Sequence, residues 1–176
     1  MKRTAKITAA MAAACVFTAG CAAGQPLPQG MRALRDYDVS KMTEYQFERV
    51  GGGRLSLSQL PSKLLLVTFF TTWSDVCIIQ MKALSNLFER DSHRGFMVVG
   101  VAMDLDGALA LEPFVRQFRI AFPVVFATEG ITSGRSPFGR VPTVPMTFVF
   151  ADGKLKWVYT GLIPASEMDA LFDMNL

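Results

Sequence analysis

The chain has 176 residues, of which 51% are hydrophobic and 19% are charged, so it suits one folded domain with an appendage and excludes disorder throughout. The formal net charge of +3 comes from Lys2, Arg3 and Lys6, because the rest of the chain carries 15 basic and 15 acidic residues. The body of the chain is therefore nearly neutral and has no basic stripe, which gives no case for a nucleic-acid partner.

The N-terminus has the pattern of an export signal, in which basic residues precede the short apolar run ITAAMAAACVFTAG. This run leads into TAGC, which resembles the lipobox of bacterial lipoproteins, although Thr18 stands where an aliphatic residue is usual. We therefore expect a signal peptide over residues 1–20 and a lipid on Cys21. The lipid would anchor the protein to a membrane of the bacterial cell envelope, facing the periplasm. Ordinary cleavage after Ala23 is the alternative.

The expected processing decides how the cysteines can be used. Cys15 would leave with the signal peptide and Cys21 would carry the lipid, so Cys77 would be the only free thiol of the mature chain. One thiol cannot form an internal disulfide, even in an oxidising compartment. The folded domain must therefore be held together by its hydrophobic core.

Residues 21–42 are rich in small, proline and polar residues and predict a flexible tether, and residues 43–176 are expected to form the domain. At the start of the domain, RLSLSQL alternates apolar and polar residues. The next run, KLLLVTFF, is continuously apolar, which is typical of a strand buried on both faces. SDVCIIQMKALSNLFER then has helical character, with Ser74 or Asp75 as its N-cap.

The second half continues to alternate strands and helices. FMVVGVAM predicts a buried strand, EPFVRQFRI a helix with Pro113 in its first turn, and FPVVFA a short strand. PMTFVFADGKLKWVYTG predicts a hairpin that turns at Asp152–Gly153, and SEMDALFDM predicts a closing amphipathic helix. Helices between buried strands predict parallel pairing, to which the hairpin adds antiparallel strands. The expected fold class is α/β, a mixed β-sheet covered by helices on both faces.

These elements, in this order, resemble the thioredoxin fold and its exported TlpA/ResA-like branch of thiol-disulfide oxidoreductases. The similarity covers about residues 45–172 and is carried by LSLSQLPSKLLLVTFFTTWSDVC, VVGVAMD and ITSGRSPFGRVPTVPMTFVFADGKL. Pro145 matches the family's cis-proline better than Pro142 does, and the resemblance implies that the backbone of Val144 pairs with an extended substrate. Trp73 matches the tryptophan of the family's redox motif and is expected to pack beside the site. The expected substrate-binding residues are Trp73, Val144 and Pro145.

The redox motif departs from the family's pattern. The family has Trp-Cys-x-x-Cys and this chain has WSDVC, so Ser74 replaces the attacking cysteine and only Cys77 keeps its sulfur. Thiol–disulfide exchange needs one thiolate to attack and a second to resolve the mixed disulfide, and a hydroxyl does neither at ordinary pH. Gln80, which cannot titrate, also replaces a glutamate that family members often carry. The first hypothesis is therefore partner or peptide binding without a dithiol cycle.

The second hypothesis is redox chemistry by Cys77 alone, as a single-cysteine enzyme or sensor that forms mixed disulfides. Helical spacing places Cys77, Met81, Leu84 and Phe88 on one stripe that is expected to face the core. Free cysteines are among the most buried residues in proteins, and a free thiol with a pKa of about 8.5 is mostly protonated at pH 7. The pattern therefore favours a buried and inert thiol over a catalytic one.

A peroxiredoxin-like peroxidase is a variant of the second hypothesis. The spacing of Ser74 and Cys77 fits that family's motif, but Phe70 stands where the motif has proline.

His93 lies in a polar connection and is expected to be solvated. One histidine with one free thiol is a poor set of metal ligands, so neither a metal nor a cofactor is expected. The expected partners are a membrane, through the lipid on Cys21, and an unidentified envelope protein or peptide.

Overall fold

The computed structural model describes residues 31–32, 37–104 and 107–175, so the predicted signal peptide, Cys21 and most of the predicted tether lie outside the described ranges. The helices and strands are β1 Met31–Arg32, α1 Val39–Glu44, β2 Gln46–Arg49, β3 Arg54–Ser56, β4 Leu64–Phe70, α2 Asp75–Asp91, β5 Phe96–Ala102, α3 Ala108–Gln117, β6 Val124–Phe126, α4 Glu129–Thr132, β7 Met146–Ala151, β8 Lys154–Thr160 and α5 Ala165–Asn175. Two short 3-10 turns, η1 Leu57–Gln59 and η2 Ser92–Arg94, complete the described elements.

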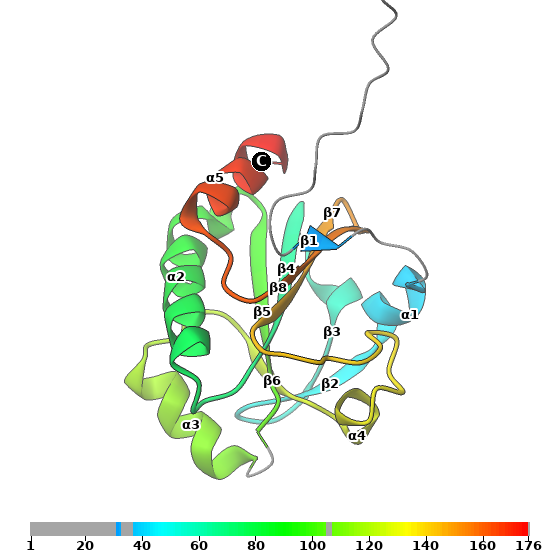
Figure 1. The fold of residues 1–176 in the computed structure, drawn as a ribbon, viewed down its shortest axis with the longest axis vertical. Helices are drawn as coiled ribbons and strands as arrows, with labels where there is room; N and C mark the ends of the chain where they lie inside the picture. Colours follow the sequence, from blue (N-terminus) through cyan, green and yellow to red (C-terminus); the bar gives the residue numbers. More distant parts are fainter. Residues whose placement is uncertain (1–30, 33–36, 105–106, 176) are drawn as a thin grey trace, which may run out of the picture.

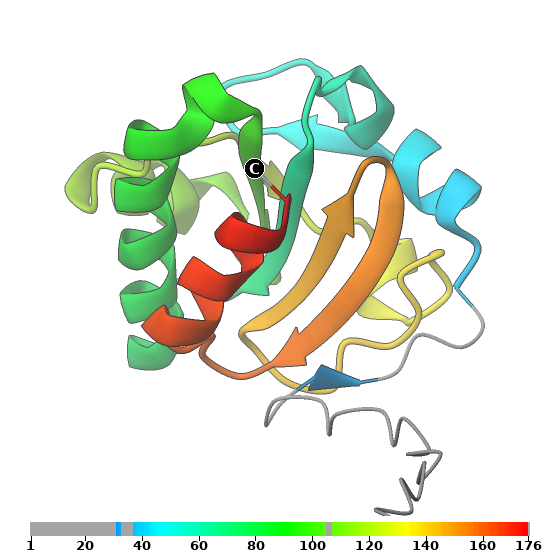
Figure 2. The same ribbon diagram turned by 90° about the horizontal axis from the view of Figure 1, so that it is seen from above.

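The described strands form one eight-stranded mixed sheet in the order β1-β8-β7-β4-β5-β6-β2-β3. The central strands β4, β5 and β6 are parallel, whereas β7 and β8 on one side and β2 and β3 on the other pair in the antiparallel sense. Helices α2, α3 and α5 cover one face, and α1 and α4 cover the other, as Figures 1 and 2 show. The predicted mixed α/β sheet with helices on both faces is confirmed.

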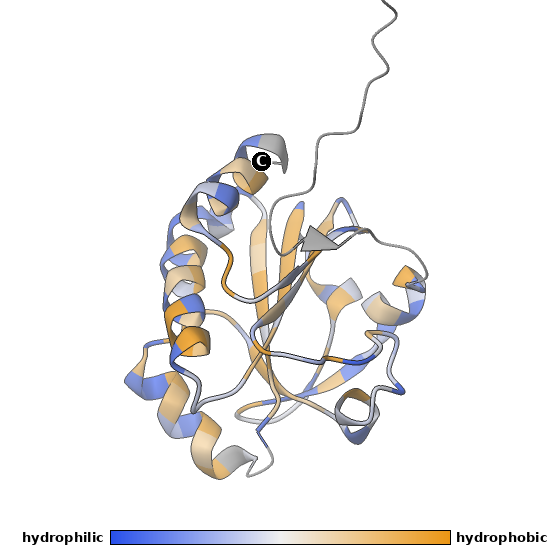
Figure 3. Ribbon diagram, viewed as in Figure 1, coloured by the Kyte–Doolittle hydropathy of each residue, from blue (hydrophilic) through white to orange (hydrophobic). Residues whose placement is uncertain are grey.

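The core consists of two hydrophobic clusters, one on each face of the sheet. All seven residues of β4 are buried, and its side chains alternate between the clusters because successive residues of a strand point to opposite faces. Leu66 and Phe70 belong to the cluster beneath α2, whereas Val67 and Phe69 belong to the cluster beneath α1 and α4. This double burial explains why the run is apolar without interruption, and Figure 3 shows the central strands as the most hydrophobic part of the fold.

The structure corrects the predicted start of the domain. Helix α1 crosses the boundary predicted at residues 42 and 43, and Met42 is fully buried in the core. The Asp38 carboxylate caps this helix by accepting a hydrogen bond of 3.2 Å from the Lys41 amide. Farther upstream, β1 pairs with β8 at the edge of the sheet. The folded part therefore begins before Thr43, because one short helical turn with a single core residue leaves almost no periodic signal in a polar segment.

Other elements differ from the prediction in extent. The alternating segment RLSLSQL is a strand only as far as Ser56 and then turns into η1. Helix α3 begins at Ala108, so Pro113 lies inside the helix and not in its first turn. Burial of Leu111 and Phe114 on either side of this proline anchors α3 to the sheet, which outweighs the local cost of the proline. No helix in the described part of the chain is long and apolar enough to cross a membrane.

Candidate functional site

The predicted site lies at the edge of the sheet where β4 ends and α2 begins. Strand β7 starts at Met146 opposite Phe69, so the residues before it reach the same edge as the turn that follows β4. The peptide bond between Val144 and Pro145 is cis, as predicted for this position. Pro145 is buried, whereas Val144 is half-buried and packs against both core clusters. The sheet therefore brings the WSDVC turn and the cis-proline to one edge of the molecule.

Asp104 holds the turn in place from the neighbouring strand. It follows β5, which runs parallel to β4 and ends at the same edge. Its carboxylate accepts hydrogen bonds from the Thr72 amide, at 3.0 and 3.2 Å, and from the Thr72 hydroxyl, at 2.7 Å. Hydrogen bonds to a charged acceptor are among the stronger ones in proteins. Asp104 was not among the predicted site residues, although an acidic residue directly after a buried parallel strand is a signal for this edge.

Ser74, one of the two predicted candidates, is the N-cap of α2. Its backbone is extended, and its side-chain oxygen accepts a hydrogen bond of 3.4 Å from the Cys77 amide. Serine is one of the preferred N-cap residues because its short side chain can satisfy an amide that has no partner within the helix. Asp75 in the first turn adds a negative charge at the positive end of the helix dipole. At the position where the resemblance implies a cysteine, the chain thus carries an oxygen that caps the helix.

Cys77 is a free cysteine with no exposed surface. It belongs to the core cluster beneath α2 together with Met81 and Leu84, and the half-buried Phe88 packs against the same cluster. The predicted core-facing stripe is therefore confirmed, with Phe88 at its margin. The thiol is therefore enclosed by the core and is out of contact with solvent.

Gln80 links α2 to the loop between β8 and α5. Its side chain is almost completely buried, and its Oε1 atom accepts a hydrogen bond of 2.9 Å from the Ile163 amide. Its Nε2 atom is buried and has no hydrogen-bond partner among the described residues. At the position where the resemblance implies a glutamate, the chain therefore carries a neutral side chain that fixes a loop.

A row of hydroxyl groups crosses the sheet on the face that α2 and α5 cover. Strand register places Thr68, Thr147 and Tyr159 side by side on β4, β7 and β8, and the Thr147 hydroxyl donates to the Thr68 hydroxyl at 3.0 Å. Burial, and then the carboxylate of Glu167, raise the pKa of the Tyr159 hydroxyl above its ordinary value. These three polar groups beneath the helices are therefore uncharged at physiological pH.

The surface beside the turn is apolar and exposed. Trp73 is 75% exposed, which corrects the expectation that it packs beside the site. Val76 and Ile79 on α2 and Leu162 before α5 are also exposed large hydrophobic residues. The predicted residues thus divide into a buried group, Cys77 and Pro145, and a solvent-facing group led by Trp73.

The remaining features lie away from the turn. His93 is exposed in η2, and no group of three metal-ligating side chains was found among the described residues.

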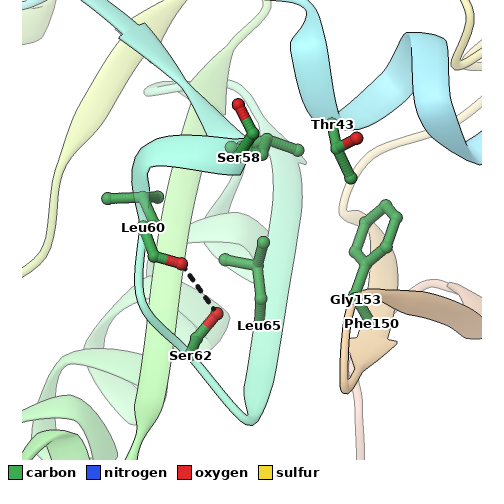
Figure 4. A pocket seen from close by; sticks show the side chains of 8 residues that line it. Thr43, Ser58, Leu60, Ser62, Leu65, Phe150 and Gly153 are labelled. Atoms are coloured by element: carbon green, nitrogen blue, oxygen red, sulfur yellow. Dashed lines mark hydrogen bonds between the residues drawn. The ribbon is translucent and has the colours of Figure 1, made fainter.

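A pocket of about 140 Å³ is shown in Figure 4, and the residues that line it include Leu65 and Phe150. The Ser62 hydroxyl donates a hydrogen bond to the Leu60 carbonyl beside this pocket. Leu65 lies at the start of β4, so this pocket and the WSDVC turn lie at opposite ends of the strand.

Solved structures with this architecture are thioredoxin-like. A thiol:disulfide interchange protein of the thioredoxin family from Chlorobium tepidum superimposes with a TM-score of 0.66 at 23% identity, over 81% of this chain and 99% of that one. A secreted disulfide oxidoreductase from Mycobacterium tuberculosis, homologous to DsbE of E. coli, superimposes with a TM-score of 0.63 at 19% identity, over 76% of this chain and 97% of that one. The thioredoxin-like fold predicted from the sequence is confirmed.

Residues 39–158 match the AhpC/TSA family, and the chain belongs to this family. It is 25% identical over 149 residues to the thiol-disulfide oxidoreductase ResA of Bacillus subtilis, which covers 83% of this chain and 81% of that protein. It is also 24% identical over 137 residues to ResA of Oceanobacillus iheyensis, covering 78% of this chain and 68% of that protein. The predicted resemblance to ResA-like thiol-disulfide oxidoreductases is thereby confirmed.

The contact between Asp104 and Thr72 leads to a testable prediction. Asp104→Ala should lower the free energy of unfolding by about 1–3 kcal/mol, because it removes a charged acceptor and leaves the Thr72 groups unpaired. Thr72→Ser keeps the hydroxyl donor and should change stability little, whereas Thr72→Val should reproduce part of the loss. Chemical denaturation measures stability, and hydrogen exchange of the Thr72 amide reports the turn. If the Thr72 amide exchanges its hydrogen at the same rate in Asp104→Ala as in the natural chain, the turn does not depend on this carboxylate.

Proposed function

We propose that this protein is an envelope-anchored, thioredoxin-like member of the thiol-disulfide oxidoreductase family that binds a partner protein or peptide and does not run a dithiol cycle. The observation that carries the proposal is the pair formed by Ser74 and Cys77. The oxygen of Ser74 caps α2, and the one sulfur of the motif is fully buried in the core. Neither position offers the exposed thiolate that would attack a disulfide.

The binding part of the proposal rests on the surface that remains at the same edge. Trp73 presents most of its side chain to solvent, and the half-buried Val144 stands before the cis bond to Pro145 at this edge. An exposed aromatic ring beside a backbone segment can bind an extended apolar peptide, because the ring supplies contact area and the backbone supplies hydrogen bonds. Such binding does not need a reactive sulfur.

The anchoring part of the proposal rests on the N-terminal sequence. A basic start, an apolar run and TAGC support export and lipidation of Cys21, so that the domain would face the periplasm. The structural neighbour from Mycobacterium tuberculosis is a secreted protein, which supports an extracytoplasmic location. A tether that ends in a lipid would keep the binding surface close to membrane partners.

The second candidate function is a single-cysteine redox enzyme or sensor, including a peroxiredoxin-like peroxidase. The spacing between Ser74 and Cys77 is the observation in its favour. It requires that the thiol become accessible, because peroxide and alkylating reagents react with an exposed thiolate. The complete burial of Cys77 therefore favours the first function.

Thiol labelling distinguishes the two functions. We expect Cys77 in the native protein at pH 7 to stay unmodified by iodoacetamide and to react only after denaturation, because its sulfur has no contact with solvent. Mass spectrometry of tryptic peptides reports the modification of Cys77 and, in the same sample, the lipid on Cys21. Rapid native labelling, sulfenate formation after brief peroxide treatment, or insulin reduction that depends on Cys77 would each contradict the proposal.

Restoring the missing sulfur tests whether Ser74 is the reason for the expected inactivity. Ser74→Cys recreates the two-sulfur motif, so the oxidised variant should contain a disulfide to Cys77 and should reduce insulin above the level of the natural chain. Ser74→Ala is the matched control, which should remain inactive and lose about 1 kcal/mol of stability with the helix cap. Equal insulin reduction by the natural chain and by Ser74→Cys would show that the serine does not limit turnover.

Partner binding can be tested in cells that make the full chain. A photo-crosslinking residue at Thr143, which is exposed beside the cis-proline, should capture a partner protein or peptide. The same residue at Leu109, which is 88% exposed on α3, is the matched control and should capture much less. Trp73→Ala should weaken the crosslink at Thr143. Equal capture at both positions, or no effect of Trp73→Ala, would argue against a binding surface at this edge.

A further inference from the structure

One side of α2 is apolar and is not covered by the rest of the chain. Val76 and Ile79 are 45% and 56% exposed, and Leu162, which leads into α5, is 45% exposed. A groove of about 430 Å³ lies between α2 and α5, and Ala83 and Leu87 line it from α2. Figures 1 and 2 show the two helices side by side on the same face of the sheet. We call Val76, Ile79, Ala83, Leu87 and Leu162 the α2–α5 face.

This face carries three of the five exposed large hydrophobic residues in the described part of the chain. Of the five exposed large hydrophobic residues, Leu109 lies apart on α3, and Trp73 stands next to the face at the start of α2. Monomeric proteins seldom leave a continuous apolar patch beside a groove in contact with water, so such a patch marks an interaction surface. The pattern of residues along α2 indicates what covers it.

We propose that the α2–α5 face binds a second copy of this chain, with the two α2 helices packed antiparallel across a twofold axis at Ala83. Two identical surfaces can bind each other around such an axis only if the surface is complementary to itself. The proposal goes beyond the proposed function, because it concerns the side of α2 and not the edge that carries the cis-proline.

The residues that α2 contributes to the α2–α5 face have this self-complementary arrangement. Val76, Ile79, Ala83 and Leu87 are three or four residues apart, so they line one side of the helix. Ala83 is the smallest of them and lies at the centre, which lets two helix axes approach closely. In an antiparallel pair centred on Ala83, Ile79 of each copy lies opposite Leu87 of the other and beside its groove.

The charges at the two ends of α2 match the same arrangement. Asp75 begins the helix, and Arg90 lies in its last turn and lines the groove. Antiparallel packing about Ala83 brings Asp75 of each copy close to Arg90 of the other, twice in the dimer. Arg90 donates to Asp91 of its own chain at 2.6 Å, but its side chain is still 60% exposed. A parallel pair would instead place like charges together, so the charges favour the antiparallel pair.

An unrelated partner would not require this symmetry. An apolar peptide could fill the groove with any sequence of charges along α2, whereas a second copy needs opposite charges at similar distances on either side of a small central residue. Asp75 lies eight residues before Ala83 and Arg90 seven residues after it, so each charge reaches within one position of the other across the pair. The self-complementary pattern therefore favours a second copy as the occupant.

Introduced thiols test the twofold axis directly. In the full chain, the sulfurs of two Ala83→Cys copies would face each other across the axis, so mild oxidation of intact cells should give a disulfide-linked dimer as the main product. Lys82→Cys is the matched control, because Lys82 points toward Phe118 of α3, with its Nζ atom 5.8 Å from the ring centroid. The control should stay largely monomeric on a non-reducing gel.

A second substitution shows whether the dimer depends on the α2–α5 face. Ile79→Glu in the Ala83→Cys chain should reduce the crosslinked fraction several-fold, because each dimer would contain two buried charges. Leu109→Glu, on the isolated exposed leucine, should leave it unchanged. Equal crosslinking by Ala83→Cys and Lys82→Cys, a disulfide to a different protein, or a dimer insensitive to Ile79→Glu would overturn the proposal. Thiol labelling of Cys77 and capture at Thr143 report on the proposed function independently of these outcomes.

Discussion

The close packing of α2 on the central strands is the constraint on which the site depends. Gly100 on β5 has no side chain, and the Cε atom of Met81 lies 2.9 Å from the place that a Cβ on Gly100 would take. Met81 belongs to a stripe of fully buried residues with Cys77 and Leu84, and the burial of this stripe sets how α2 is rotated about its axis. Cys77, one turn before Met81, must then face the core, whereas Ile79 must face solvent. The burial of the thiol and the exposure of the α2–α5 face thus both follow from the way α2 packs on the sheet.

The turn before α2 is held by two contacts that involve no sulfur atom. Ser74 stands just before the helix, where a side-chain oxygen reaches the Cys77 amide, and Asp104 holds the preceding residue Thr72. The turn is therefore well ordered without any bond between sulfurs. A serine is compatible with this turn, because the helix cap and the Asp104 contact need only oxygen and nitrogen groups.

The sequence predicted those features that depend on local pattern. The apolar runs identified the central strands, and Asp152 and Gly153 turn the terminal hairpin with φ angles of 49° and 71°, as an Asp-Gly pair favours. Features that depend on distant partners were missed. Met42 is a core residue because β-strands far along the chain cover it, and Asp104 is important because β5 ends beside the turn. Neither relation leaves a repeating signal in the sequence.

The layer beneath α2 indicates what kind of chemistry the fold can support. General acid–base catalysis needs a group that exchanges a proton near the working pH. Gln80 cannot ionise, and burial and the Glu167 carboxylate keep Tyr159 in its neutral form by raising its pKa. The Gln80 amide instead binds the Ile163 backbone and holds the loop that carries Leu162 to the surface. The position at which the resemblance implies a glutamate thus helps to shape the exposed face here.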